Sequence, residues 1–150
     1  YLMIYAVASL GAWSVVISME KNDNQGTEIN DLAGLGKRAP LLAAAMTVFM
    51  LSFTGIPLTL GFWGKFYLFR TAIEGGFIGL AVIGLLTSLA SAFYYLRVVV
   101  KMYFQEGTPE IHWNFWTSAI AIFAAMVLVV FSFLPGNLLN LAVKSLLIGT

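Results

Sequence analysis

Cysteine is absent from this chain, charged residues are scarce and histidine occurs once. Without cysteine the chain can hold no disulfide, iron–sulfur cluster or thiolate metal site. A net charge of only +1 provides no basic surface for nucleic acid. The single histidine, His112, stands beside Trp113 in a short polar connector, where we expect an interfacial side chain rather than a catalyst. We therefore expect no cofactor and no metal site in this chain, and any redox chemistry that it serves belongs to other polypeptides.

Apolar residues dominate the composition instead. Hydrophobic residues make up 60% of the 150 positions and charged residues 10%, whereas soluble domains average about 45–50% and about 25%. A water-soluble fold could not bury this much apolar surface. The sequence therefore predicts a single membrane domain over residues 1–150, embedded in a lipid bilayer. Because Tyr1 opens directly into an apolar run, without methionine or a charged leader, we expect the C-terminal part of a longer chain.

Four segments are apolar and long enough to cross a membrane, for which a helix needs about 20 residues. We predict an all-α polytopic membrane protein with four transmembrane crossings, the second of them a broken helix. The crossings cover about residues 1–19, 41–73, 77–100 and 115–134.

Local signals mark the ends of these segments. In the polar connector 20–39, Asp31 is predicted to be the N-cap of a short interfacial helix over residues 31–35. Pro40 suits the first position of the next helix, because its missing N–H would have no intrahelical partner there. Pro135 and the glycine after it are predicted to stop the fourth crossing before an amphipathic tail.

Basic residues are distributed unevenly between the two sides of the predicted bundle. Those at the connectors between crossings one and two and between crossings three and four are Lys21, Lys37, Arg38, Arg97 and Lys101, and those on the opposite side are Arg70 and Lys144. Connectors rich in lysine and arginine stay on the cytoplasmic side. Both connectors are therefore predicted to be cytoplasmic, with both chain ends on the outer side of a bacterial inner membrane.

The second apolar region is too long for one straight crossing. Its 31 residues from Leu41 to Thr71 would make a helix of about 46 Å, well beyond a hydrocarbon core of about 30 Å. Pro57 removes a backbone donor and disfavours helical geometry at the residue before it. We predict two half-helices, about 41–54 and 61–73, joined by unwound backbone at 55–60, rather than a simple proline kink. The residues expected to shape this break are Gly55, Pro57, Gly61 and Gly64.

Lys65 lies one helical turn past the predicted break, among aromatic residues. An ammonium in hydrocarbon costs at least about 2.5–3.5 kcal/mol, so such a lysine usually faces the bundle interior or water. Desolvation also disfavours the charged form of a lysine, which favours release of a proton. We predict a proton-relay lysine. The alternative is a lysine that snorkels to the interface from the far end of a long helix.

The other charges suggest more ordinary tasks. Arg70 and Glu74 are one helical turn apart and are expected to form an exposed ion pair of little energetic value. Arg97 and Lys101 share a helix face and repel each other, which favours anchoring at lipid headgroups.

A stripe of small and weakly polar residues follows one face of the third crossing. It consists of Gly84, Ser88, Ser91 and Tyr95. Such stripes usually mark close packing between helices, although one that faces Lys65 could hold a water chain.

The run from Leu51 to Tyr67, with its Gly-Ile-Pro, Gly-Phe and Gly-Lys elements, resembles the antiporter-like membrane subunits of proton-pumping NADH:quinone oxidoreductase (complex I). Among these subunits it is most similar to subunit N, the counterpart of mitochondrial subunit 2. The segments Asp31–Leu35 and Ala92–Val98 are similar to the same subunit, so the resemblance extends over most of the chain.

This resemblance implies the last four helices of a larger subunit, including a broken helix. It implies that Lys65 is the lysine of the channel half that opens to the outside, and that the other relay residues lie on earlier helices. NADH, flavin, iron–sulfur clusters and quinone would be bound by other subunits of the complex. The implied function is proton translocation coupled to electron transfer from NADH to quinone in the respiratory chain, and the implied partners are other membrane-arm subunits, the bilayer and protons.

The sequence also allows two other functional interpretations. Subunits of multisubunit cation/proton antiporters and of membrane-bound hydrogenases share the break and a lysine. A purely structural membrane module, whose broken helix only packs against its neighbours, would need no titratable lysine.

Pro57→Ala is expected to impair transport or assembly more than Pro135→Ala, because Pro57 shapes backbone inside the membrane. Proton uptake by membrane vesicles that carry either variant checks this expectation. Wild-type uptake and assembly in both variants would contradict a role of Pro57 in the break.

Overall fold

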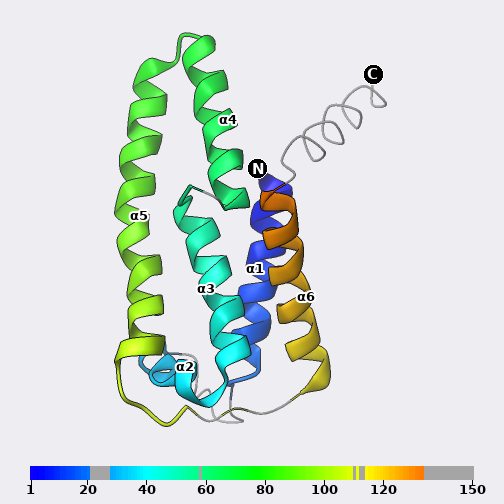
Figure 1. The fold of residues 1–150 in the computed structure, drawn as a ribbon. Coiled ribbons are helices and arrows are strands. Elements are labelled where there is room, and N and C mark those ends of the chain that lie inside the picture. The colour runs from blue at the N-terminus through cyan, green and yellow to red at the C-terminus, as the bar shows by residue number, and fades with distance from the viewer. Residues whose placement is uncertain (21–27, 58, 110, 112–113, 134–150) are drawn as a thin grey trace.

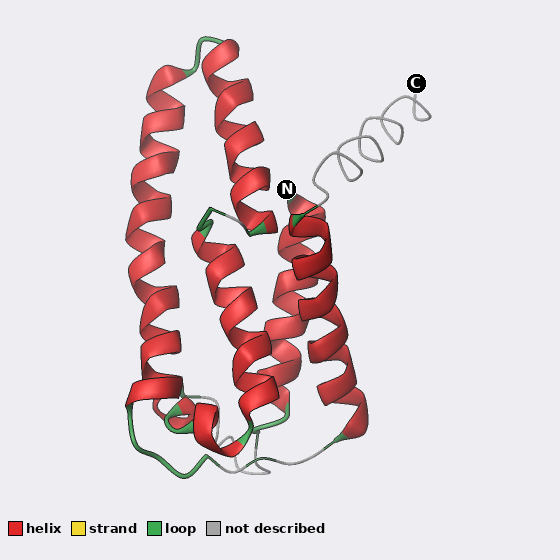
Figure 2. Cartoon of the chain, in the orientation of Figure 1, coloured by secondary structure: helices red, strands yellow, loops and turns green. Residues whose placement is uncertain are grey.

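A computed structural model of the chain describes residues 1–20, 28–57, 59–109, 111 and 114–133. All regular elements within these ranges are helical (Figure 2). They are α1 (Leu2–Ile17), the 3₁₀ helix η1 (Ile29–Leu32), α2 (Leu35–Arg38), α3 (Pro40–Thr54), α4 (Leu60–Glu74), α5 (Ile78–Phe104) and α6 (Phe115–Ser132). The expectations for His112, for a stop at Pro135 and for the tail after it lie outside the described residues.

The longer helices form an elongated bundle. Helices α1, α3 and α6 lie side by side, and α5 runs along both α3 and α4 (Figure 1). Helix α4 begins near the end of α3 and continues beyond it to the turn that joins α4 to α5. Elements η1 and α2 lie at the opposite end, where the chain also passes from α5 to α6.

Helix α5 sets the length of the bundle. Its 27 residues span about 40 Å, and α3 and α4, with 15 residues each, together match that length. Among the described helices, α5 and α6 are long and apolar enough to cross a membrane, whereas α1 and α3 are apolar but shorter. Pro40 is the first residue of α3, as predicted. Helix α5 continues one turn past its predicted end, and within that turn Lys101, expected at the headgroups, donates a hydrogen bond to Asn30.

Small side chains line the contacts between α1, α3 and α6. The buried alanines are Ala8 and Ala12 on α1, Ala43 and Ala45 on α3, and Ala121, Ala124 and Ala125 on α6. Gly11 lies directly against the ring of Phe49, and a Cβ at Gly11 would overlap that ring. Small residues let helix backbones approach closely, which is the packing typical of helices inside membranes.

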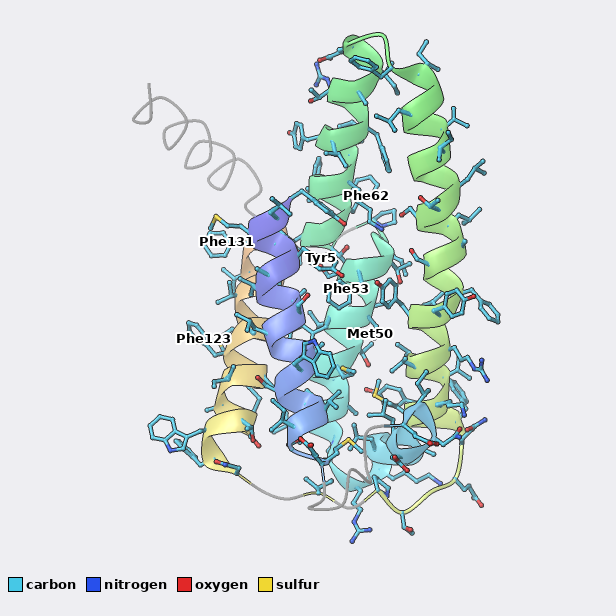
Figure 3. All side chains as sticks on the ribbon, turned by 180° about the vertical axis from the view of Figure 1, so that it is seen from behind. Tyr5, Met50, Phe53, Phe62, Phe123 and Phe131 are labelled. Carbon is cyan, nitrogen blue, oxygen red and sulfur yellow. The ribbon has the colours of Figure 1, made fainter. Side chains whose placement is uncertain are left out.

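Large apolar side chains point away from this core. Leu89 and Phe93 on α5 are 71% and 67% exposed, and Phe123 on α6 is 69% exposed. Figure 3 shows Phe123 pointing outward from α6. Soluble domains rarely leave so much apolar surface exposed, so the packing agrees with the composition in indicating helices made for lipid or for further apolar helices.

The predicted helix over residues 31–35, with Asp31 as its N-cap, is wrong. Asp31 is the third residue of η1, and its carboxylate accepts a hydrogen bond of 3.0 Å from the backbone N–H of Glu28, the actual N-cap. The helical geometry then stops, because Ala33 is extended and Gly34 adopts a positive φ of 78°. Asp31 therefore closes a capping box from inside the helix instead of starting it.

Glu74→Cys is expected to label from one side of the membrane, and Lys37→Cys and Glu106→Cys from the other, because Glu74 ends α4 at one end of the bundle and the other two lie at the opposite end. The chain has no cysteine of its own to contribute background. A membrane-impermeant maleimide applied to oriented vesicles of the assembled protein makes the measurement. Labelling of Lys37→Cys and Glu106→Cys from different sides would contradict the arrangement.

Candidate functional site

Helices α3 and α4 run in the same general direction, and the segment between them interrupts the helix (Figure 1). Helix α3 ends at Thr54, and Gly55 follows with a φ of 78°, a left-handed conformation that favours glycine. Pro57 lies exposed in the turn beyond it. Thr59 is the N-cap of α4, and its hydroxyl accepts a hydrogen bond of 3.4 Å from the N–H of Phe62.

Glycine allows the start of α4 to approach the end of α3. A Cβ at Gly61 would overlap the backbone carbonyl oxygen of Ser52. A Cβ at Gly55 would lie 3.0 Å from the Cδ of Lys65, tighter than ordinary van der Waals contact. Gly64 faces α1, where its added Cβ would lie 3.2 Å from the ring of Tyr1. The three glycines predicted at the break therefore each remove a side chain at a close contact.

The last four carbonyls of α3 have no partners within the helix, as at any helix end. Backbone N–H groups just past the helix serve two of them. The N–H of Gly55 lies 3.0 Å from the carbonyl oxygen of Leu51 and 3.1 Å from that of Ser52, and the N–H of Ile56 lies 3.3 Å from the Leu51 oxygen. The final two carbonyls of the helix are left for a donor from elsewhere.

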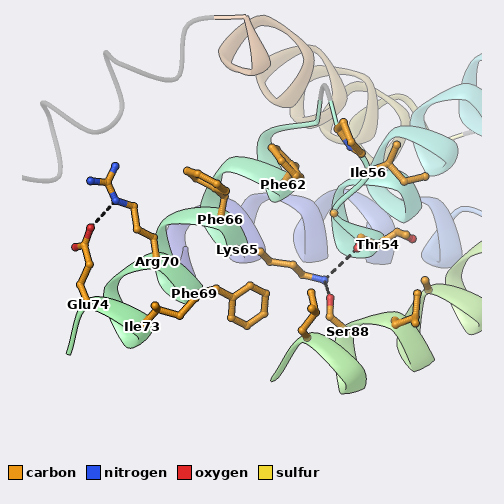
Figure 4. A pocket seen from close by; sticks show the side chains of 15 residues that line it. Thr54, Ile56, Phe62, Lys65, Phe66, Phe69, Arg70, Ile73, Glu74 and Ser88 are labelled. Carbon is orange, nitrogen blue, oxygen red and sulfur yellow. Dashed lines mark hydrogen bonds and ion pairs between the residues drawn. The ribbon is translucent and has the colours of Figure 1, made fainter. Parts of the chain in front are cut away.

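Lys65 supplies that donor. Its Nζ lies 2.7 Å from the carbonyl oxygen of Phe53. It also lies 3.2 Å from the carbonyl oxygen of Thr54, a contact that Figure 4 shows. A third contact of 2.6 Å joins Nζ to the hydroxyl oxygen of Ser88 on α5. The cation thus sits at the C-terminal end of α3, where the helix dipole presents negative potential. The half-buried Lys65 points into the bundle rather than snorkelling to its end.

A cavity of about 820 Å³ opens beside this lysine, between α4 and α5. Lys65, Gly55 and Ser88 line it at the helix break, and Arg70 and Glu74 line it at the far end of α4. The rest of its lining is mainly aromatic and aliphatic. The lysine and the serine are therefore open to this cavity on one side.

The predicted ion pair at the end of α4 is confirmed. The Nε of Arg70 lies 2.7 Å from the Oε1 of Glu74, and the two side chains are 59% and 61% exposed. Solvent and salt screen an exposed pair of this kind, and holding two long side chains in one geometry costs entropy. Its effect on stability is therefore small.

The predicted stripe on α5 divides into separate contacts. Ser88 meets Lys65, and the Ser91 hydroxyl donates a hydrogen bond of 2.8 Å to the Ser88 carbonyl one turn back on its own helix. The ring of Tyr95 packs against the ring of Phe53, with 5.2 Å between centroids. Of the three, Ser88 is the one whose side chain hydrogen-bonds the lysine.

Sequence reasoning missed the carbonyl acceptors on Phe53 and Thr54. Backbone oxygens are common to all residues, so no residue type announces them. The relative positions of a glycine and a lysine could have indicated these acceptors. A glycine that ends one half-helix, followed by a lysine in the second turn of the next, places a cation opposite the open end of the first.

The chain is similar to known proteins along most of its length. Residues 1–91 match the family model described as NADH:quinone oxidoreductase/Mrp antiporter, TM. The chain is 43% identical over 149 residues to NADH-quinone oxidoreductase subunit N of Bdellovibrio bacteriovorus, covering 98% of this chain and 31% of that protein. It is 46% identical over 136 residues to subunit N of Trichlorobacter lovleyi, covering 91% of this chain and 28% of that protein.

A solved structure gives the same result for the fold. A chain of respiratory complex I from Thermus thermophilus with bound aureothin superposes with a TM-score of 0.76 and 34% sequence identity. The match covers 89% of this chain and 32% of that one. The present chain thus spans about a third of the length of the proteins that it matches.

Gly61→Ala is expected to destabilise the protein by about 1–3 kcal/mol, because the added methyl group must push α4 away from the Ser52 carbonyl. Gly79→Ala on α5 is the matched control, since nothing lies within 4 Å of its added Cβ. The midpoint of thermal unfolding in detergent measures the difference. A midpoint for Gly61→Ala that is as high as that for Gly79→Ala would contradict the close approach.

Proposed function

The chain belongs to the transmembrane family of NADH:quinone oxidoreductase and Mrp antiporter subunits, and on that basis we propose that it is part of a proton-translocating membrane-arm subunit of NADH:quinone oxidoreductase. The resemblance drawn from Leu51–Tyr67 is confirmed by the family match, and the chain is an integral membrane protein. The relatives named subunit N support assignment to the oxidoreductase rather than to an antiporter or a hydrogenase.

In this proposal the chain carries protons and performs no redox step. NADH, flavin, iron–sulfur clusters and quinone belong to other subunits, and the chain contributes to the enzyme as a non-redox component. Its partners are other membrane-arm subunits, the lipid bilayer and protons, with no nucleic acid. Its expected location is the bacterial inner membrane.

Helices α3 and α4 act together as one broken crossing, so that the chain crosses four times. Two observations support this assignment. Their combined length matches that of α5, and α5 runs along both (Figure 1). Unwound backbone within a membrane is tolerated where protein or water satisfies its polar groups, and Lys65, Thr59 and Gly55 do so here. The basic connectors then face the cytoplasm and both chain ends lie outside.

Lys65 is the proton carrier of this segment. The observation that carries the proposal is its ammonium at the end of α3, held by two carbonyls and a hydroxyl beside an open cavity. A cation inside a membrane segment is costly and marks an ion path by default. An amine can alternate between charged and neutral forms, whereas the guanidinium of arginine stays charged.

The structural-module alternative assigns Lys65 to capping alone. Capping accounts for the hydrogen bonds from Lys65 to the two carbonyls. Backbone N–H groups of a following turn could cap the same carbonyls without the cost of desolvating a charge. A titratable cation beside a cavity of about 820 Å³ favours transport over capping.

Lys65→Met is expected to abolish most proton pumping, together with the electron transfer that is tightly coupled to it, in an assembled complex. Removal of a partly desolvated ammonium removes a cost, and water from the cavity can reach the two carbonyls that lose a donor. Lys65→Arg is expected to restore little, because a guanidinium remains protonated. The proton-to-electron ratio of reconstituted complex measures the effect.

Arg97→Met is the matched control, because it removes an exposed cation from α5 and leaves the helix break intact. It is expected to pump normally. A full proton-to-electron ratio in an assembled Lys65→Met complex would overturn the role of Lys65 and favour the structural module.

A further inference from the structure

The three contacts of Lys65 differ in what they can do with a proton. An ammonium has three N–H donors, and three acceptors surround it at 2.7, 3.2 and 2.6 Å. The described geometry therefore fits the protonated amine. Two of the acceptors, on Phe53 and Thr54, are backbone carbonyls, which can accept a hydrogen bond but can never donate one.

The neutral amine has two N–H groups and one lone pair, so it needs one donor among the same partners. The hydroxyl of Ser88 is the one member of the three that can reverse its role, because a hydroxyl both donates and accepts. Its distance of 2.6 Å to Nζ is also the shortest of the three. The carbonyls can hold Lys65 in place in both forms while the contact to Ser88 changes direction.

Among the described residues, the Ser88 hydroxyl makes no hydrogen bond to its own helix, unlike the hydroxyls of its neighbours. Hydroxyls elsewhere on these helices donate to a carbonyl one turn back on their own helix, as Thr87 does to Gly84 and Ser91 to Ser88. The Ser88 hydroxyl instead meets a side chain 23 positions away in the sequence. Ser88 and Lys65 both line the cavity between α4 and α5, so water in that cavity can meet the serine hydroxyl.

We propose that Ser88 is the residue with which Lys65 exchanges its proton. The inference rests on the proposed transport function of Lys65 and adds the residue through which the proton enters and leaves. When Lys65 discharges, an Nζ–H bond breaks and a new O–H bond forms on Ser88. The original O–H bond of Ser88 breaks at the same time, and that proton passes to a water molecule in the cavity.

The serine stays neutral throughout this exchange. The positive charge moves from the amine to water, and the re-formed hydroxyl then donates a hydrogen bond to the lone pair of Lys65. Charging Lys65 is the same sequence in reverse. No oxidant, metal or cofactor is needed.

The sharpest test compares two side chains of the same shape at this position, in the complete complex. Ser88→Thr keeps a hydroxyl, and Ser88→Val replaces it with a methyl group that also keeps water from taking its place. Ser88→Val is expected to lower the rate of coupled NADH:quinone turnover about tenfold or more, since a positioned proton-transfer group typically contributes 10²–10⁴-fold. Ser88→Thr is expected to retain most of the rate.

The controls separate proton exchange from packing. Ser91→Ala removes a hydroxyl whose hydrogen bond stays within α5, and it is expected to turn over normally. The KM values for NADH and quinone are expected to stay unchanged in Ser88→Val, while kcat falls. Native gels report assembly, and the Thr and Val variants are compared only as assembled complexes, with Ser88→Ala in place of Ser88→Val should the latter not assemble.

The outcomes distinguish the inference from the function on which it rests. Loss of coupled turnover in both Lys65→Met and Ser88→Val, with Ser88→Thr active, supports the exchange. Loss in Lys65→Met with full activity in Ser88→Val overturns the role of Ser88 and leaves Lys65 as carrier. Equal loss in Ser88→Thr and Ser88→Val shows a packing defect and also overturns it, whereas full pumping by Lys65→Met removes the proposed function itself.

Discussion

The fold around the site depends on how the open end of α3 is satisfied. A helix that ends inside a protein leaves four carbonyls without partners, and each one buried without a hydrogen bond costs about 1–3 kcal/mol. Here the turn after Gly55 serves two of them, and the Lys65 ammonium serves the last two. A cation that would be costly in hydrocarbon meets carbonyls that would be costly unpaired. Each feature makes the other tolerable.

Close packing is what brings the two partners together. Lys65 can reach back to α3 because α4 starts directly beside the end of that helix, and the contact at Gly61 leaves no room for a side chain between them. Helix α5 then lies against both half-helices and adds the hydroxyl of Ser88. The position of the ammonium is therefore fixed from three helices, although only one of its three acceptors is a side chain.

Much of this arrangement could be predicted from residue types and spacing. The length of the apolar run, Pro57 and the glycines indicated an interruption near residues 55–60, and the lysine just after it indicated a buried cation. These features rest on local rules, namely the missing donor of proline, the freedom of glycine and the cost of a charge in hydrocarbon. Local rules also predicted Pro40 at a helix start and the pair between Arg70 and Glu74.

The features that escaped prediction are those decided by contacts between distant segments or by backbone atoms. The carbonyls of Phe53 and Thr54 became acceptors because α4 folds back beside them, which no property of phenylalanine or threonine reveals. Asp31 was expected to begin a helix, yet the N–H that it serves belongs to Glu28, three residues earlier. A carboxylate can cap a helix both from the N-cap position and from the third helical position.

The unbroken course of α5 beside two short helices limits how the break can move. Because α3 and α4 both pack against α5, at least one of them must give up contacts with α5 if the two half-helices move apart sideways. Lys65 lies on α4 and its partner Ser88 on α5, so a displacement of α4 along α5 would also change that contact. The break is thus bridged by a continuous helix that also contributes a contact to the charge beside it.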